Sequence, residues 1–537
     1  MRLFESVLLK TPGACLEELW RRVPGYIRWT FFAAVILGLG THLYVFTNKF
    51  ANVDDLRYLF LSDYGAASGR WLLPFAAGLD GDLSFPWLIG LLGVLCLAGT
   101  ACLSTSLLRI RSALGCILAA ALVVTFPGSA DTFCFMFTAD TYFLSMLLAA
   151  LGAYAAVRWG WWGSAAGALA IALSLGIYQA YLPVAAVLMV GALLFEVLDG
   201  EKTGRQLFLK GLRLVGTLAA GLAVYMLVVQ VTTGGYLTGY MGLDSMGKIS
   251  LRELPGMILS AYKGYFRMFI RDDLELHAGL WWVALVLVGL GSCSAGVALL
   301  WKRKLGPART ALALLLALLY PLAGDLIFVM GVKGTMHTRM LYGIVYILLL
   351  PIGLTEYSAA DLGRGRRGIL HRGMSWVVAG TMLAAAWNYA IVDNSAYLKA
   401  DLVTRQCEAY SNRMLGRIES CPGYGPWVEV VLVGSEQWSE DLNTMPQLED
   451  IHIYSAMNLP SLRTAYSYDY FLRCFLGFPA PVYLGSSPEA QELAATEEVR
   501  EMPLYPQEGS VKMVHCESKD TDTIVVKLGE MTEAPQT

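Results

Sequence analysis

The sequence has few charged residues for its length. Only 15% of its 537 residues are Asp, Glu, Lys or Arg, whereas soluble proteins average about 25%. Hydrophobic residues make up 56% of the chain. The net charge of −3 lacks the basic excess that binds nucleic acid, so we exclude nucleic acid as a partner. This composition predicts a polytopic membrane protein whose helices contact membrane lipid.

The sequence also lacks metal-binding cysteine patterns, internal repeats and low-complexity runs. No CxxC or Cys/His spacing indicates zinc. The first apolar segment is too long for a removable signal peptide and has no small-residue cleavage site, so we expect a retained transmembrane helix. Four of the ten cysteines lie in the polar C-terminal region. Four cysteines allow three connectivities, and Cys407–Cys421 with Cys474–Cys516 is one of them.

Long apolar segments alternate with short polar loops up to residue 391. A bilayer core of about 30 Å needs about 20 mainly apolar residues per helix. The sequence therefore predicts about 11 transmembrane helices, at residues 29–47, 85–107, 112–127, 138–158, 162–177, 180–198, 211–231, 279–301, 310–331, 339–358 and 374–391.

Lys and Arg gather in alternate loops, beginning with the N-terminal segment 1–28. Because basic loops stay on the cytoplasmic side, the opposite loops and residues 392–537 are expected to be extracytoplasmic. After residue 391 the composition becomes that of a soluble domain. We predict helices at 394–420 and 461–476 and strands at 427–434 and 523–528, which together make a small α/β domain.

The first extracytoplasmic loop, NVDDLRYLFLSDYGAASGRW at 52–71, carries many charges for so apolar a chain. One interpretation is a solvated juxtamembrane turn, because Asn52 and Asp54 are good helix N-caps. The other is chemical, since a carboxylate pair such as Asp54 and Asp55 can act as a general base or hold a divalent cation. The residues alone leave both interpretations open.

The next two extracytoplasmic turns add polar groups. In the loop 126–140, Asp131 could be an N-cap after a Pro-Gly pair, whereas Asp140 has apolar flanks. Carboxylates at membrane depth are costly and tend to be functional. Tyr178 and Gln179 lie in the following turn, where such residues also commonly join neighbouring helices.

The last extracytoplasmic turn, 325–343, brings Lys333, His337 and Arg339 within seven residues of one another, beside two glycines. Basic groups with flexible glycines suit a phosphate, although Arg339 could also snorkel to the interface. The long loop 232–278 contains Lys263, Arg267 and Arg271 at intervals of four, interleaved with aromatics. That spacing predicts an amphipathic helix lying on the membrane surface.

Acidic loops, a basic loop and aromatics on one predicted face suit transfer of a group from a lipid phosphate. A carboxylate would deprotonate the acceptor hydroxyl and basic groups would stabilise the leaving phosphate. Two alternatives are a transporter or flippase of lipid-linked sugars and a non-catalytic envelope-polymer assembly protein. A transporter is expected to carry charged or broken helices at mid-membrane, whereas here the charges lie in the loops.

Several motifs in this order have a familiar pattern. The first span is followed by N-x-D-D and then G-R-W; FPGSADTFCFMFTADTYFLS (126–145), LSLGIYQAYLP (173–183) and MPLYPQEGSVK…TIVVKL (502–528) come later. Together they resemble the serotype-converting Gtr-type (type II-like) bacterial glucosyltransferases of the GT-C membrane glycosyltransferase superfamily. The resemblance covers nearly the whole chain. It implies a GT-C-like fold in a multi-pass protein of the bacterial inner membrane, with its active site outside the cytoplasm.

The resemblance also implies chemistry. The expected donor is a polyprenyl-phosphate-linked hexose, glucose in particular, and the expected acceptor is an extracytoplasmic glycan such as O-antigen or another cell-envelope polysaccharide. The catalytic acid of the first outer loop maps onto Asp54 or Asp55, and some family members hold a divalent cation (Mg or Mn) near it. The expected phosphate ligands are Lys333, His337, Arg339 and Arg70. Further donor or acceptor contacts are assigned to Asp131, Asp140, Tyr178 and Gln179.

Overall fold

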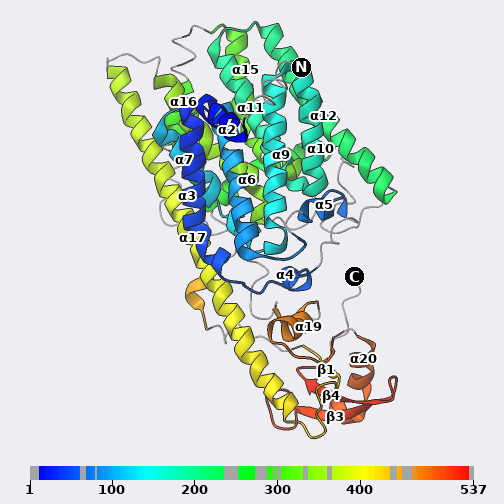
Figure 1. Cartoon of the computed structure of the whole chain (residues 1–537). Helices are drawn as coiled ribbons and strands as arrows, with labels where there is room; N and C mark the ends of the chain where they lie inside the picture. The colour runs from blue at the N-terminus through cyan, green and yellow to red at the C-terminus, as the bar shows by residue number, and fades with distance from the viewer. Residues whose placement is uncertain are drawn as a thin grey trace. The chain divides into compact units, whose positions relative to one another are not determined.

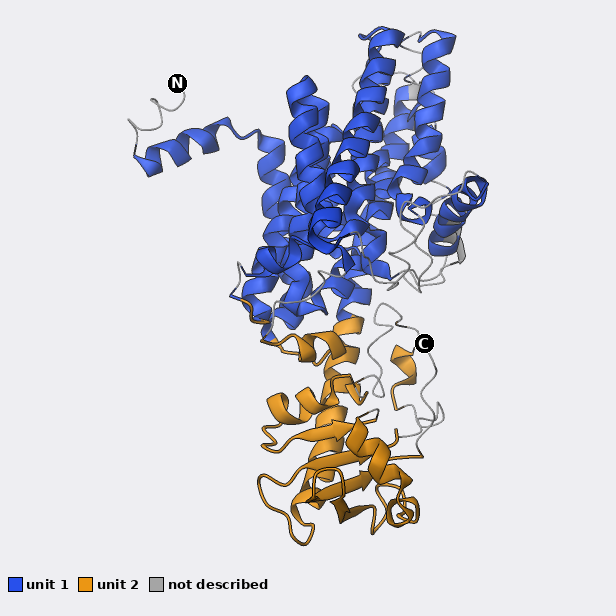
Figure 2. Cartoon of the chain, turned by 90° about the vertical axis from the view of Figure 1, so that its right-hand side faces the viewer, with its two compact units in different colours: residues 1–47, 62–81, 85–394 blue, residues 48–61, 82–84, 395–537 orange. Residues whose placement is uncertain are grey.

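The computed structural model divides the chain into two compact units (Figure 2). Unit 1 comprises residues 1–47, 62–81 and 85–394, and unit 2 comprises residues 48–61, 82–84 and 395–537. The residues that the structure describes are 11–60, 68–78, 81–234, 252–271, 286, 288–293, 295–296, 299, 303, 305–330, 337–359, 366–435, 444–449, 451, 462–464, 466–485 and 487–530.

Unit 1 is built of helices (Figure 1). Its longer helices in the first half are α2 (Pro12–Arg22), α3 (Gly25–Thr47), α6 (Pro86–Leu107), α7 (Ala113–Thr125), α9 (Ala139–Arg158), α10 (Gly160–Ile177), α11 (Leu182–Asp199) and α12 (Gly204–Thr233). They are followed by α13 (Leu254–Phe266), α15 (Pro307–Gly324), α16 (Tyr346–Ala359) and α17 (Arg366–Glu419), of which residues 395–419 belong to unit 2. Short pieces between them are α5 (Leu73–Ala77), α8 (Gly128–Phe133), η2 (Met136–Thr138), η3 (Gln179–Tyr181), η5 (Arg267–Arg271), η6 (Leu326–Val329) and η7 (Thr338–Val345).

Within the described residues, nine helices are long and apolar enough to cross a membrane. The protein is therefore a polytopic helical membrane protein, as composition predicts. The count of 11 is not reached for two reasons. The helix expected at 112–127 forms as α7 but has only 13 residues, and the span expected at 279–301 lies largely outside the described residues.

The end of the membrane region differs from the prediction. The sequence predicts separate helices at 374–391 and 394–420, whereas α17 is one helix of 54 residues from Arg366 to Glu419. No glycine or proline interrupts it near the expected break. The amide of Asn394 donates to the carbonyl oxygen of Ala390 at 2.8 Å and to that of Thr41 at 3.2 Å. These bonds satisfy the polar side chain, so the helix continues through it.

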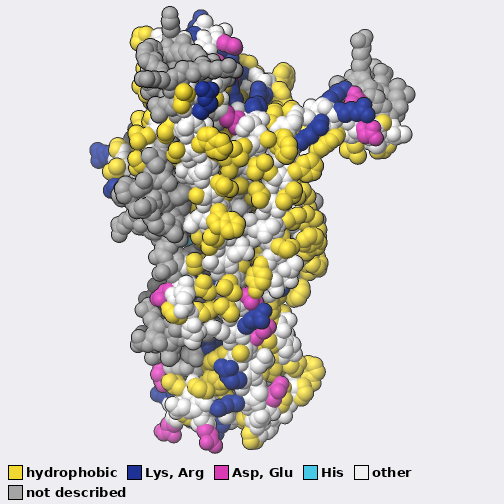
Figure 3. Space-filling model, turned by 90° about the vertical axis from the view of Figure 1, so that its left-hand side faces the viewer, with side chains coloured by type: hydrophobic (Ala, Val, Ile, Leu, Met, Phe, Trp, Pro, Cys, Tyr) yellow, Lys and Arg dark blue, Asp and Glu magenta, His cyan; other side chains and the backbone are white. Residues whose placement is uncertain are grey.

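The helices of unit 1 approach closely where small residues face each other. Helix α9 packs against α6 and α10, and α3 packs against α6 and α7. A Cβ atom on Gly167 of α10 would lie 2.6 Å from the carbonyl oxygen of Gly152 on α9. Small residues allow such backbone contact between membrane helices. Hydrophobic side chains cover much of the outer surface, as Figure 3 shows for one face, and the large ones exposed include Trp29, Ile36, Trp376 and Leu383.

The polar groups of unit 1 separate into its two ends. At one end, Arg109 forms an ion pair with Asp199, and Glu196 forms ion pairs with Lys202 and Lys210. We call this the basic end, because further arginines donate there to backbone carbonyl oxygens of Ser106, Ala156, Leu198 and Gly200; they are Arg111, Arg158, Arg213, Arg303 and Arg309. The turns that contain Asp131, Tyr178 and Arg339 connect the opposite ends of the helices. This segregation agrees with the alternation of loops in the sequence.

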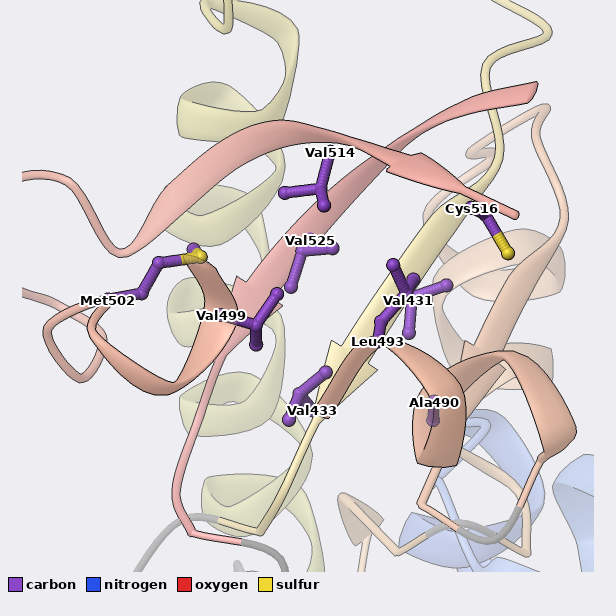
Figure 4. Close-up of a cluster of buried hydrophobic side chains, with 9 residues drawn as sticks. All are labelled: Val431, Val433, Ala490, Leu493, Val499, Met502, Val514, Cys516 and Val525. Carbon is purple, nitrogen blue, oxygen red and sulfur yellow. The ribbon is translucent and has the colours of Figure 1, made fainter. Parts of the chain in front are cut away.

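Unit 2 contains a sheet of four strands within its described residues. The strands are β1 (Val430–Val433), β2 (Val482–Leu484), β3 (Val511–Cys516) and β4 (Thr521–Lys527), in the order β2-β1-β4-β3. Strand β1 runs parallel to β2 and β4, whereas β3 and β4 form an antiparallel pair. Helices α20 (Pro488–Ala495) and α21 (Glu497–Arg500) close a core with the sheet (Figure 4). Val431, Leu493 and Val525 are fully buried there.

One prediction about unit 2 is wrong. The helix expected at 461–476 is replaced, in its described part, by α19 (Tyr468–Tyr470) and the π-helix η10 (Phe471–Phe475). Among the three connectivities that the sequence left open for Cys407, Cys421, Cys474 and Cys516, none is formed, and all four thiols are free. Cys516 instead packs in the core of Figure 4, where a free Cys behaves as a small hydrophobe.

Candidate functional site

A buried ion pair lies at the end of unit 1 opposite the basic end. Asp131 lies in α8 and is 3% exposed. Its Oδ2 accepts a hydrogen bond from the backbone N–H of Arg339 at 2.9 Å, and its Oδ1 accepts one from Nη1 of the same residue at 3.1 Å. The Arg339 guanidinium also lies over the ring of Phe135, 4.1 Å from its centroid. Asp131 therefore fixes both the backbone and the side chain of Arg339.

The sequence left two interpretations of Arg339, a phosphate ligand and a side chain that snorkels to the interface, and the burial of its guanidinium bears on both. A snorkelling arginine extends its guanidinium into water, whereas the Arg339 side chain is only 14% exposed. A desolvated arginine held by a carboxylate on one side is pre-organised to bind an anion on the other.

A second arginine lies on a pair of stacked tyrosines. The rings of Tyr142 and Tyr178 are 4.1 Å apart at an interplanar angle of 8°. Arg70 donates from Nη1 to the hydroxyl of Tyr142 at 2.9 Å, and its guanidinium carbon lies 5.0 Å from the Tyr178 centroid. Burial raises the pKa of Tyr178 to about 12, and the charges of Arg339 and Arg70 partly oppose this rise. Tyr178 is thus a neutral hydroxyl within the field of both arginines.

Gln179 holds the segment that carries Arg70. Its Nε2 donates to the carbonyl oxygen of Ser68 at 2.8 Å and to the hydroxyl of Tyr225 at 3.0 Å. Close by, a Cβ on Gly176 would lie 2.6 Å from the indole of Trp71, so the Trp-bearing loop rests directly on helix α10. These contacts join Gln179 to the segment of Arg70, and the expected contact of Gln179 with donor or acceptor stays a prediction.

The sequence also predicts contacts with donor or acceptor for His337, Asp140 and Lys333. His337 is half-buried, and burial together with the nearby Arg339 lowers its pKa, so it is neutral at pH 7. Asp140 is 6% exposed in the first turn of α9, where its Oδ1 accepts from the backbone N–H of Thr141 at 2.7 Å. Lys333 lies outside the described residues.

Asp54 and Asp55 belong to unit 2, on the short helix α4 (Val53–Arg57). Asn52 is its N-cap, with Oδ1 accepting from the backbone N–H groups of Asp54 at 2.9 Å and Asp55 at 3.4 Å. Asp55 is 1% exposed, and its carboxylate binds the ammonium of Lys49 and the hydroxyl of Ser84. Asp54 is half-buried. The two neighbouring carboxylates therefore have different surroundings.

The surroundings of Asp55 do not fit a divalent cation. Throughout the part of the chain that the structure describes, no group of three His, Cys, Asp or Glu side chains could hold a metal ion. The ammonium of Lys49 already lies against the carboxylate of Asp55, and two cations cannot share that position without strong repulsion. We therefore derive no catalytic step that uses a metal.

Sequence reasoning missed two buried carboxyl groups, Asp325 and Asp393. Both are 0% exposed, and neither carboxylate has a hydrogen-bond partner among the residues described. Asp325 follows α15, and a Cβ on Gly264 of α13 would lie 2.5 Å from its Oδ2. Burial raises the pKa of Asp325 to about 8. Asp140 was singled out because a carboxylate beside apolar residues at membrane depth tends to be functional. The same rule applies to Asp325 and Asp393.

The fold and the candidate site together define the class of this protein. The chain is a polytopic helical membrane protein with a buried arginine, tyrosine and aspartate cluster at one end of its helical unit. The family model described as Glucosyl transferase GtrII matches residues 43–350, more than half of the chain, and the chain belongs to this glucosyltransferase family. The family resemblance of the sequence is thereby confirmed. No curated protein and no solved structure gave a significant match.

Proposed function

We propose that the protein transfers glucose from a polyprenyl-phosphate donor to an extracytoplasmic glycan of the cell envelope. Its family is one of glucosyltransferases, so glycosyl transfer is the class of activity. The observation that supports a phosphate-linked donor is the arrangement of Arg70 and Arg339 around the stacked pair Tyr142 and Tyr178. Two guanidinium groups suit the oxygens of one phosphate, and an aromatic platform suits the apolar face of a sugar ring.

In this proposal the two arginines act on the leaving group. The acceptor oxygen forms a bond to the anomeric carbon while the bond from that carbon to the phosphate oxygen breaks. The electron pair of the broken bond remains on the phosphate, and the fixed charges of Arg70 and Arg339 stabilise it. Asp131 holds the Arg339 guanidinium in position. The guanidinium therefore does not have to move when negative charge develops on the phosphate. The predicted contacts of Asp131, Asp140, Tyr178, Lys333 and His337 with donor or acceptor remain part of the proposal.

We assign the proton transfer to Asp54 rather than Asp55. Asp55 is 1% exposed and its carboxylate is already bound by Lys49 and Ser84, which leaves little access for an acceptor hydroxyl. Asp54 is half-buried on the same helix. Asp54 would accept the proton of the acceptor hydroxyl. Asp55 would hold α4 in position through Lys49 and Ser84.

The proposed location is the bacterial inner membrane, with the arginine cluster and residues 392–537 on the extracytoplasmic side. The support is the basic end of unit 1, which carries Arg109, Lys202, Lys210 and Arg309. Basic loops favour the cytoplasmic side. A lipid-linked sugar is the natural donor on the other side, where nucleotide sugars are scarce.

Purified protein with polyprenyl-phosphate glucose and candidate glycans tests the proposal. We expect Arg339→Ala and Arg70→Ala each to lower transfer about 10²-fold and to weaken donor binding. Arg205→Ala changes an exposed arginine at the basic end and is the matched control, with transfer unchanged. Normal transfer and normal donor affinity in both cluster variants would reject the phosphate assignment.

The same material separates the two alternatives. A flippase would move labelled donor across vesicle membranes without consuming it, and an assembly protein would support neither reaction. Absence of transfer with every glycan, together with transbilayer movement of the donor, would replace the transferase proposal with the transporter.

A further inference from the structure

Unit 1 has a second polar feature, a cleft of about 840 Å³ at its basic end. The end of α9, the whole first half of α10 and the first half of α12 contribute to its walls. Four basic residues line it, namely Arg158, Lys202, Lys210 and Arg213, and no acidic residue is among its lining. Its volume is that of an ordinary ligand site. The proposed transferase chemistry does not use it.

Two residues that line the cleft each have a buried polar atom without a partner in the described part of the chain. The hydroxyl of Ser164 on α10 is unpaired, and this residue is only 8% exposed. The Nε of Arg213 on α12 is unpaired too, although its Nη2 donates to the carbonyl oxygen of Ala156 at 2.9 Å. A buried donor left without an acceptor is unfavourable. Two such donors on one cleft indicate a missing acceptor.

The charge balance of the cleft points to an anion. Glu196 neutralises part of it, because it pairs with Lys202 at 2.6 Å and with Lys210. Arg158 and Arg213 bind backbone carbonyl oxygens, of Ser106 at 3.4 Å and of Ala156 respectively. A carbonyl satisfies a hydrogen bond but carries no net charge. Arg158 and Arg213 have no acidic partner among the residues that the structure describes, so the lining is positive overall.

The surroundings of the cleft place it at the boundary between headgroups and acyl chains. The turn between α9 and α10 exposes Trp159, Trp161 and Trp162, by 63%, 78% and 87%. Exposed tryptophans mark the membrane–water interface. Below this level Leu209 and Leu212 of α12 are 51% and 59% exposed, as side chains in contact with lipid are. The further cleft walls are apolar and small; they include Ala165, Ala168, Gly216 and Ala220.

We propose that this cleft binds an anionic diacyl phospholipid of the surrounding leaflet. The lipid phosphate accepts hydrogen bonds from the Ser164 hydroxyl and the Arg213 Nε, with Arg158 closing the site. One acyl chain lies along the small residues of α10 and α12. Basic pockets between transmembrane helices bind anionic headgroups in this manner. A soluble anion would leave the apolar walls uncovered, and for this reason we assign the site to a lipid.

Native mass spectrometry of the full-length protein with phosphatidylglycerol or phosphatidylcholine measures this binding. We expect tighter binding of phosphatidylglycerol by at least tenfold. Arg213→Gln should reduce that preference about fivefold, the effect of one basic residue near an anionic surface. Arg205→Gln is the matched control, because Arg205 lies on the same helix, is exposed and does not line the cleft. It should leave the preference unchanged.

Gly216→Leu tests the acyl-chain path without removing a charge. A Cβ on Gly216 has no atom within 4 Å, so the protein accommodates the larger side chain while the cleft becomes filled. We expect this variant to fold normally and to lose phosphatidylglycerol binding at least tenfold. It also keeps the proposal testable if Arg213→Gln fails to fold.

Competition distinguishes the sources of the phosphate. Inorganic phosphate at millimolar concentration should not displace phosphatidylglycerol, and a polyprenyl phosphate, which the proposed function assigns to the arginine cluster, should not displace it either. Equal binding of the two phospholipids, displacement by inorganic phosphate, displacement by the polyprenyl phosphate, or unchanged binding in Gly216→Leu would each overturn the proposal.

Discussion

Replacing Asp325 by asparagine should stabilise the protein more at neutral pH than at acid pH. The residue is 0% exposed, and neither carboxylate oxygen has a partner in the described chain. Asparagine has nearly the same shape and no charge. Both the neutral acid and the amide leave polar atoms unpaired in this site, so the two side chains differ mainly in ionisation.

The magnitude follows from the pKa of Asp325, which burial raises from 3.8 to about 8. Below pH 3.8 the carboxyl is protonated in folded and unfolded chains, and its ionisation costs no stability. Between the two pKa values the unfolded chain ionises and the folded chain does not, so stability falls as pH rises; above pH 8 the loss is constant. One pKa unit is about 1.4 kcal/mol, which gives a loss of about 4 kcal/mol at pH 7 and about 2 kcal/mol at pH 5.

Thermal unfolding in detergent at pH 5 and pH 7 measures this difference. We expect Asp325→Asn to raise the unfolding temperature at pH 7 and to raise it clearly less at pH 5. Glu201→Gln removes an exposed carboxylate and should change neither value. If Asp325→Asn shifts both temperatures equally, or lowers stability at pH 7, then a partner stabilises the carboxylate and the reasoning fails. A gain of stability with loss of transfer would indicate that the buried acid is retained for function.

Three further predictions concern the site and the packing around it. Asp54→Asn should lower transfer about 10²-fold or more with little change in unfolding temperature. Asp55→Asn should mainly lower the unfolding temperature, because it removes the carboxylate that binds a lysine. The reverse pattern would mean that the roles of Asp54 and Asp55 are exchanged. Arg339→Lys should lower transfer at least tenfold, since an ammonium cannot reproduce the two-point geometry of a guanidinium, and wild-type kinetics would show that only its charge matters. Gly343→Ala should destabilise unit 1 by about 1–3 kcal/mol, because its Cβ would lie 2.2 Å from the carbonyl oxygen of Gly324; an unchanged unfolding temperature would contradict this close approach.

The membrane helices were largely predictable from the sequence. Helices α3, α6 and α9 begin and end within a few residues of the predicted spans 29–47, 85–107 and 138–158, because a window of about 20 apolar residues is a local property. Strand β1 lies within the predicted stretch 427–434, and β4 begins two residues before the predicted stretch 523–528 and ends one residue before its end. The break expected before residue 394 is absent, because no glycine or proline lies near that position and α17 continues to Glu419.

The candidate site was predictable as a set of residue types but not as an arrangement. Arg70, Asp131, Tyr178 and Arg339 were all expected to bind a ligand, and the structure brings them together at one end of unit 1. The sequence did not predict that Asp131 binds Arg339, and it assigned no role to Tyr142. Asp325 could have been found by the burial rule, had its neighbours in α13 been known.

The sequence by itself determined that this protein is embedded in a membrane, that basic residues gather in alternate loops, and which family it belongs to. These properties depend on local hydrophobicity, on local charge and on the order of short motifs. Only the tertiary structure decided which side chains meet. Arg339 and Asp131 are separated by 208 positions, and Arg70 and Tyr142 by 72. Contacts at such separations depend on how the helices pack, and packing is a property of the whole unit rather than of any one segment.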